Sequence, residues 1–180
     1  MSYLAPFAVA LGLFMPGFAF AAGSDSSNPP APTETSTECK KTEVWDEKTQ
    51  KCVDAQSGQL DNDTLYQAAR ELAYAGRPDD ALVVLGAMTE GETDRVLTYM
   101  GFATRKAGDL EGGMAYYQAA LAKNPDNLLT RSYMGQAFVE QGKITLAAAQ
   151  LDEIVLRGGA GTWPEKALRH AIETGATYSY

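Results

Sequence analysis

The sequence predicts an all-α fold of about three helix–turn–helix repeats with a C-terminal capping helix, and two observations carry this prediction. Tyr99-Met100-Gly101 recurs 34 residues later as Tyr133-Met134-Gly135, and Gly108 recurs at the same interval as Gly142. Within each copy, apolar residues lie at the spacing of one helix face. Because a shift of 32 residues adds a shortened earlier copy, we expect repeats that begin near residues 62, 94 and 128.

Each copy divides into two helices at a turn that contains glycine. In the middle copy Gly108-Asp109 ends the first helix, residues 110–123 form the second, and Asn124-Pro125-Asp126 ends it. Gly101 and Gly135 are predicted where two helices cross closely, because a larger side chain would push the helices apart. The other two copies turn at Ala75-Gly76-Arg77 and at Gln141-Gly142-Lys143.

A last helix is expected over residues 164–174, within a capping segment at 162–175. Thr162-Trp163-Pro164-Glu165 has the residues of a capping box, and Leu168 and Ile172 share one face of the helix that follows. A stack of repeats needs such a helix to cover its last apolar face.

At these residues the sequence resembles the tetratricopeptide repeat family. The middle copy carries the run Leu-x-x-Met-Gly at 97–101, and the resemblance covers residues 62–159. It implies a stack of helix pairs whose first helices line a concave groove that binds another protein or a peptide. Two residues depart from the family pattern, Arg131 in place of a large apolar residue and Gly113 in place of an alanine. The other matching positions are Tyr117, Ala120, Pro125, Met134, Gly135, Phe138 and Ala147.

The N-terminal residues have the layout of a secretory signal peptide. Residues 1–21 carry no charged side chain, their apolar run ends in the triplet Ala19-Phe20-Ala21, and cleavage is expected after Ala21. The usual basic start is missing, so the alternative is an uncleaved anchor in the inner membrane. We expect a periplasmic or secreted protein that does not associate with a membrane after cleavage. Residues 22–38, rich in Pro, Ser and Thr, are expected to form a disordered linker.

Cys39 and Cys52 bound a short segment that we expect to be a disulfide-linked hairpin over residues 39–53. In an oxidising compartment the two cysteines should pair, because the chain has no other thiol. Its pattern resembles a small Cys-bounded hairpin of exported proteins, some of which bind polysaccharide. Trp45 would either stack on a sugar ring or cover the disulfide. With a linker at 54–61 and a spacer before it, we expect the hairpin to be independent of the repeats.

Composition and charge exclude several classes of function. The formal net charge is −8, and no long run of Lys or Arg is present, which disfavours nucleic acid as a partner. The single histidine, His170, and two cysteines cannot build a Cys/His zinc site, so we expect no metal and no cofactor. No nucleophile or phosphate-binding loop stands in a recognisable setting, and we expect no enzymatic activity.

The resemblance to tetratricopeptide repeats places a set of basic and aromatic residues on the first helices. We expect this groove to bind an acidic or C-terminal peptide, because Arg pairs bidentately with carboxylates and aromatic rings supply apolar anchors. The alternative is that these residues form only a solvated helix face. The expected partner-binding residues are Tyr66, Arg70, Tyr74, Arg95, Thr98, Phe102, Arg105, Lys106 and Gln136.

Two functions therefore remain open from the sequence. The first is a periplasmic interaction module or scaffold that binds a partner peptide in its groove. The second is a cell-wall or polysaccharide-associated protein that uses the hairpin as its contact.

Overall fold

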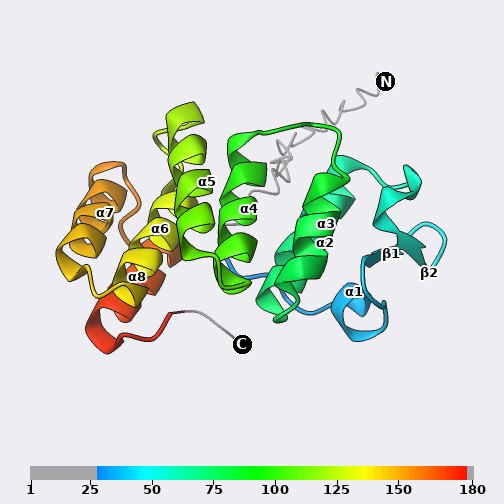
Figure 1. The fold of residues 1–180 in the computed structure, drawn as a ribbon, viewed down its shortest axis with the longest axis horizontal. Coiled ribbons are helices and arrows are strands. Elements are labelled where there is room, and N and C mark those ends of the chain that lie inside the picture. The colour runs from blue at the N-terminus through cyan, green and yellow to red at the C-terminus, as the bar shows by residue number, and fades with distance from the viewer. Residues whose placement is uncertain (1–27, 178–180) are drawn as a thin grey trace, which may run out of the picture.

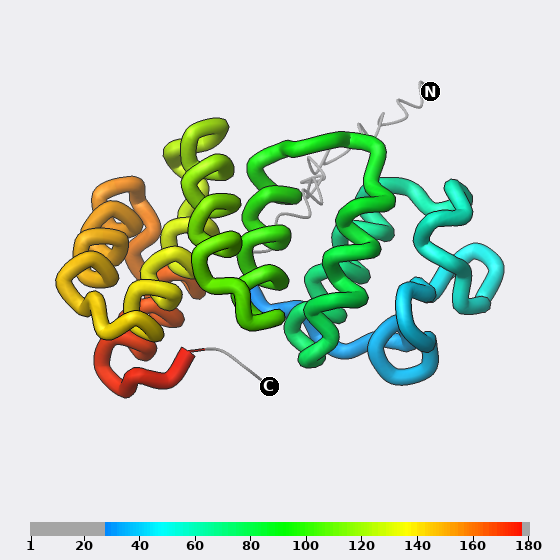
Figure 2. Tube along the Cα trace, in the orientation of Figure 1, coloured from blue at the N-terminus to red at the C-terminus, as the bar shows by residue number. Residues whose placement is uncertain are grey.

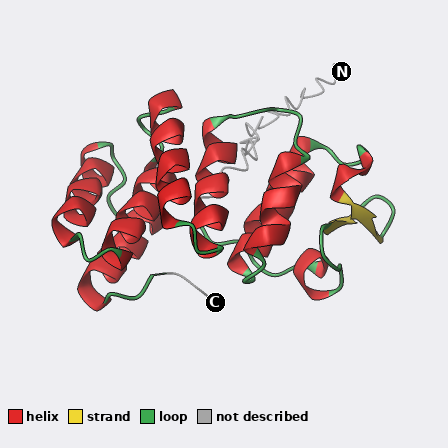
Figure 3. Ribbon diagram, viewed as in Figure 1, coloured by secondary structure: helices red, strands yellow, loops and turns green. Residues whose placement is uncertain are grey.

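The structure is a computed structural model of the 180-residue chain, and it describes residues 28–177. The expected signal peptide and its cleavage site lie outside the described residues. Helices dominate the rest, with one small hairpin near the N-terminal end (Figures 1 and 3). The elements are α1 (Glu34–Thr37), β1 (Glu43–Asp46), β2 (Lys51–Asp54), a 3₁₀ turn (Ala55–Ser57), α2 (Asn62–Tyr74), α3 (Pro78–Gly86), α4 (Asp94–Lys106), α5 (Leu110–Lys123), α6 (Leu128–Glu140), α7 (Ile144–Leu156) and α8 (Trp163–Thr174).

The helices from α2 to α7 form three consecutive pairs, as the repeat pattern predicts. Helix α2 packs on α3, α4 on α5 and α6 on α7, while the first helices also contact one another along the stack. Helix α8 follows the third pair and packs on both α6 and α7. In Figure 1 the helix pairs follow one another across the molecule, with α2 behind α3 and with α7 and α8 at the end opposite the hairpin. The predicted all-α repeat fold is confirmed.

The turn inside each repeat depends on glycine. Gly76, Gly108 and Gly142 have φ angles of +73°, +103° and +70°. This left-handed conformation is costly for residues with a Cβ, so glycine ends the first helix and lets the chain reverse into the second.

Close helix crossings explain the other recurring glycines. A Cβ at Gly101 would lie 2.6 Å from Cε1 of Tyr117 on α5, and one at Gly135 would lie 2.5 Å from Cδ2 of Leu168 on α8. Both predicted crossings are confirmed. Gly113 on α5 is also explained, because a Cβ there would lie 2.9 Å from the main-chain oxygen of Gly101.

The start of α8 differs from the prediction. The Thr162 side chain makes no capping hydrogen bond to the helix; its hydroxyl donates instead to the main-chain oxygen of Gly159, at 2.6 Å. Glu165 does not reach back either, since its carboxylate pairs with Arg169 one turn later, at 2.5 Å. The predicted capping box is therefore wrong, because both side chains have other partners.

The hairpin forms as predicted. Strands β1 and β2 pair antiparallel, with Trp45 opposite Cys52, and Cys52 is bonded to Cys39. Val44 on β1 is 1% exposed and belongs to the same apolar core as the helices of the first repeat. The hairpin is therefore a cover on the first repeat, and the expectation that it is independent is wrong.

The segment before the hairpin is also ordered. Residues 28–38 were expected to be part of a disordered linker, but they include the single-turn helix α1 and lie against α2. The reason is the buried Glu71, whose carboxylate accepts hydrogen bonds from Thr33 and Ser36. Composition could not reveal this anchor, because it lies more than 30 residues further along the chain.

Candidate interaction surface

The nine residues expected to bind a partner all lie on the first helices α2, α4 and α6, but most of them are buried. Arg95 and Lys106 are the partly exposed members of the set. The other seven are at most 5% exposed, namely Tyr66, Arg70, Tyr74, Thr98, Phe102, Arg105 and Gln136.

The aromatic members belong to a row of packed rings. Tyr74 stacks on Phe102, with ring centroids 5.0 Å apart, and Phe102 lies 4.6 Å from the ring of Tyr133 on α6. The Tyr133 hydroxyl is 2.6 Å from that of Tyr74 and 3.2 Å from that of Tyr99. Burial raises the pKa of Tyr133 well above its usual range, and the two neighbouring phenols add to that shift. These rings hold the repeats together.

Arg70 is buried among these rings, and it donates hydrogen bonds to two side chains and to one main-chain oxygen. Its Nε donates to the Tyr99 hydroxyl at 3.1 Å, its Nη1 to Oε1 of Gln67 at 2.6 Å, and its Nη2 to the main-chain oxygen of Asn28 at 2.7 Å. The guanidinium also lies over the rings of Tyr66 and Tyr99, 5.7 and 5.6 Å from their centroids. Arg70 therefore already binds the main chain of a segment of its own chain.

Arg95 is neutralised by two carboxylates. Its Nη2 lies 2.5 Å from Oε2 of Glu90, and its Nη1 lies 2.8 Å from Oδ1 of Asp63 on α2. The hydrogen bonds to Glu90 raise the pKa of Arg95, partly against the effect of burial, and Asp63 adds to the rise. Its guanidinium also lies 4.7 Å from the centroid of the Tyr66 ring. Little positive potential remains for an acidic partner.

Arg105 links two repeats. Its Nη1 donates to Glu140 at the end of α6, at 2.7 Å, and its side chain is 1% exposed. Its Nε and Nη2, and the hydroxyl of Tyr117 nearby, find no hydrogen-bond partner among the described residues. Burial lowers the pKa of the adjacent Lys106, and the positive charge of Arg105 lowers it further. The Arg105 guanidinium is therefore buried and forms its ion pair inside the protein.

Thr98 and Gln136 also have internal partners. The hydroxyls of Thr98 and Thr130 are 2.6 Å apart across α4 and α6, and the Gln136 amide donates to Ser132 at 3.3 Å. Buried polar side chains on α4 and α6 are therefore hydrogen-bonded to one another inside the stack.

The nine residues lie on the first helices, as the resemblance implies, but seven of them are interior residues that the sequence analysis took for surface residues. It also missed Glu71 on α2, which is 5% exposed. The sequence signal that could have pointed to Glu71 is its place next to Arg70 and three residues before Tyr74 on the same predicted helix. Arg131, the departure from the family pattern, is buried by its own contacts, because its guanidinium donates to the main-chain oxygen of Pro125 and to Gln150.

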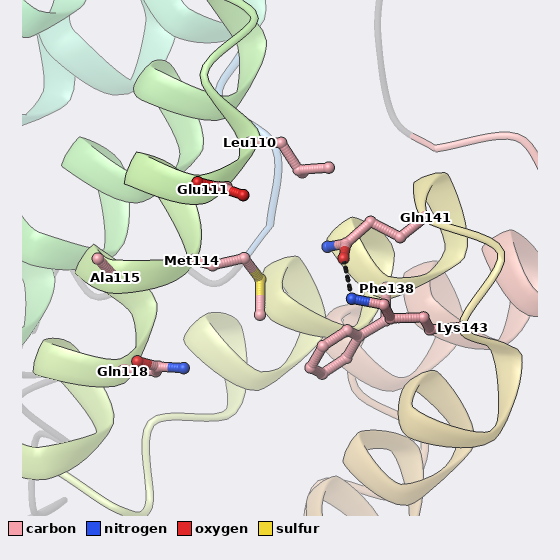
Figure 4. A pocket seen from close by; sticks show the side chains of 8 residues that line it. All are labelled: Leu110, Glu111, Met114, Ala115, Gln118, Phe138, Gln141 and Lys143. Carbon is pink, nitrogen blue, oxygen red and sulfur yellow. Dashed lines mark hydrogen bonds between the residues drawn. The ribbon is translucent and has the colours of Figure 1, made fainter.

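Besides a cavity of about 520 Å³ between α2 and the N-terminal hairpin, open space lies on the other layer of the stack. A cavity of about 440 Å³ separates α5 from the junction of α6 and α7. Figure 4 shows Met114 and Phe138 pointing toward one another across it, while Lys143 donates to Gln141 at 2.5 Å. A second cavity, of about 700 Å³, lies between α3 and α5 over α4.

Two kinds of feature are absent from residues 28–177. None of the helices there is both long enough and apolar enough to cross a bilayer. Over the same residues, the side chains that commonly bind metals form no group of three or more that could hold an ion.

Comparisons with known proteins agree with the repeat architecture. The family model described as "Tetratricopeptide repeat" matches residues 105–160. A curated relative, cellulose synthase operon protein C of Pseudomonas fluorescens (strain SBW25), is 26% identical over 105 residues. That match covers 53% of this chain and 8% of the relative, so the chain spans a small part of that protein. Comparison with solved structures gave no match.

Proposed function

We propose that this chain, which is a tetratricopeptide repeat protein, is a non-enzymatic interaction module that holds a partner polypeptide on its layer of first helices. The observation that carries this proposal is the hydrogen bond from Arg70 to the main-chain oxygen of Asn28, in which a repeat side chain binds the main chain of another segment. Repeats of this family generally bind proteins or peptides, which supports the same conclusion.

The internal pairing of the basic residues changes the expected chemistry of the partner. Arg95 faces Glu90 and Asp63, and Arg105 faces Glu140, so these charges are largely satisfied within the chain. The acidic partner expected from the sequence is therefore less favoured than one whose main chain supplies hydrogen bonds. Reversing Arg105 to Glu would not be a clean test, because the new carboxylate would be buried beside Glu140.

Site-specific photo-crosslinking in envelope extract tests the proposal. A crosslinker at Lys106, partly exposed at the end of α4, should capture a discrete partner. A crosslinker at Lys123, exposed at the end of α5, is the matched control and should capture far less. Equal capture at the two positions would mean that the layer of first helices is not the contact.

We also propose export to the periplasm, with removal of residues 1–21. The disulfide between Cys39 and Cys52 supports an oxidising compartment. N-terminal sequencing of the protein from the periplasmic fraction should begin at Ala22. An intact first residue in the membrane fraction would favour the uncleaved anchor instead.

A polysaccharide contact is the second candidate function, and the name of the relative, a cellulose synthase operon protein, is what favours it. The contact would use Trp45 on β1, which is partly exposed. Co-sedimentation with cellulose should then fall in the Trp45→Ala variant and persist in Trp163→Phe, which alters the other tryptophan. Failure of the wild-type chain to sediment would remove this candidate.

A further inference from the structure

The segment Asn28–Thr37 lies on α2 through two neighbouring charged residues, and its contacts describe a peptide-binding site. Arg70 donates to the main-chain oxygen of Asn28 at one end of the segment. At the other end, the Glu71 carboxylate accepts hydrogen bonds from the turn that begins at Thr33. In Figure 2 the blue tube leads from behind α4 to the α1 turn, along the layer of first helices.

The hydrogen bonds to the Glu71 carboxylate determine which donor groups the turn must contain. Its carboxylate accepts from the Thr33 main-chain N–H at 2.6 Å, from the Thr33 hydroxyl at 2.6 Å and from the Ser36 N–H at 2.9 Å. A carboxylate that is 5% exposed needs such donors, because a buried charge without them is strongly destabilising. The turn therefore needs a hydroxyl residue followed by free N–H groups, as a one-turn helix provides.

The residues before the turn favour an extended backbone. Pro29, Pro30 and Pro32 fix φ near the polyproline value, so little conformational entropy is lost when this stretch lies along a helix.

Residues 28–33 of the segment are also poorly buried, whereas Thr35 in the α1 turn is 4% exposed. Asn28, Ala31, Pro32 and Thr33 are exposed, so mainly polar contacts hold this stretch. Segments with few buried apolar contacts open locally at low cost. This distinguishes residues 28–33 from the hairpin, whose Val44 is in the core.

We propose that residues 28–37 occupy a peptide site on α2 and compete there with a partner of the same chemistry. That partner is a proline-containing, extended peptide with a Thr or Ser at the start of a turn, bound by Arg70 and Glu71. This inference rests on the proposed function and names the class of partner. Because the segment is tethered, its effective concentration is of the order of millimolar, so an external peptide binds weakly until the segment is released.

A labelled synthetic peptide with the sequence of residues 28–38 is the probe, and fluorescence anisotropy is the measurement. Thr33→Ala in the chain removes the hydrogen bond from the Thr33 hydroxyl to Glu71 and the N-cap bond that this hydroxyl accepts from Thr35, which should raise the affinity for the probe at least about tenfold over wild type. Thr49→Ala, in the exposed turn of the hairpin, is the matched control and should behave as wild type. A probe with alanine in place of its own Thr33 should bind about tenfold more weakly.

Adding Glu71→Gln to the Thr33→Ala chain should abolish the gain in probe binding. Circular dichroism of this double variant establishes that it is folded, and Arg70→Lys provides a second site variant if it is not. Equal probe affinity of wild type and Thr33→Ala, with the amides of residues 33–37 exchanging as slowly as the helix core, would overturn the inference. That result would leave the proposed function intact if Lys106 still crosslinks a partner.

Discussion

The two ends of the repeat stack are covered in different ways. At the C-terminal end a single amphipathic helix, α8, places Leu168 against Gly135 of α6, and the contact is apolar. At the N-terminal end α1 and the hairpin cover the first repeat, and much of the contact is polar. Glu71 accepts from Thr33 and Ser36, and Arg77 donates to main-chain oxygens of the cover.

This difference reflects what each cover is made of. Helix α8 has enough apolar surface to pack as another first helix would. The N-terminal cover is too small to have a core of its own, and it depends on a disulfide, on Val44 and on charged side chains supplied by the repeat. Stability at the C-terminal end should therefore respond most to side-chain volume, and at the N-terminal end to crosslinking and hydrogen bonding.

The largest effect is expected at the C-terminal end. Leu168→Ala removes a side chain that is 0% exposed and should lower the free energy of unfolding by about 2–5 kcal/mol, measured by urea denaturation. Gly135→Ala alone should also destabilise, because its new methyl group would lie 2.5 Å from the Leu168 side chain. Combined with Leu168→Ala, the same substitution should instead recover part of the loss. Additive effects would contradict a direct contact between the two positions.

At the N-terminal end the disulfide should dominate. Replacing Cys39 and Cys52 by Ser opens a loop with a sequence separation of 13. The chain-entropy argument gives a loss of about 3 kcal/mol for a loop of this size. Because Val44 shares the core of the first repeat, thermal melting of the helices, followed by circular dichroism, should shift to lower temperature. An unchanged helical melting curve would mean that cover and repeats are independent units.

The same comparison explains what the sequence could predict. The C-terminal half follows local rules: glycines at 108 and 142 end helices, apolar residues recur at helical spacing, and the repeat interval aligns Gly101 with Gly135. Each of these signals is a spacing between residue types that can be read directly from the sequence, so the fold and the last helix were predicted correctly.

The N-terminal cover could not be predicted in this way. The order of residues 28–38 depends on Glu71 and Arg77, far along the chain, and a Pro- and Thr-rich stretch gives no local sign of them. The burial of Arg70 and Arg105 was missed for a similar reason. Helical spacing places a residue on a layer, but only the packing of neighbouring repeats decides whether that layer is open to solvent.

A smaller effect should come from the polar contacts of the N-terminal cover. Arg77 donates to the main-chain oxygen of Cys39 at 3.1 Å and to that of Lys41. Arg77→Met should therefore lower the free energy of unfolding by about 1–3 kcal/mol and speed hydrogen exchange in the cover. Arg157→Met removes an exposed arginine that follows α7 and pairs with Asp126 and Glu153 at the surface, and it should leave both measurements nearly unchanged. If the two variants behave alike, the cover does not depend on Arg77.

The smallest effect at neutral pH is expected inside the stack, at Tyr117. Its hydroxyl is buried without a hydrogen-bond partner among the described residues, so Tyr117→Phe should change the free energy of unfolding by less than about 1 kcal/mol at pH 7, toward greater stability. Burial raises the pKa of Tyr117 to about 12, against the opposing effect of Arg105. Between its usual value of 10.0 and about 12, the unfolded chain loses this proton while the folded chain keeps it, so stability falls as the pH rises. The Phe variant lacks that contribution and should lose less stability than wild type over the same interval, as measured by urea denaturation at each pH. Parallel losses in the two chains would mean that the Tyr117 hydroxyl ionises as readily in the fold as in the unfolded chain.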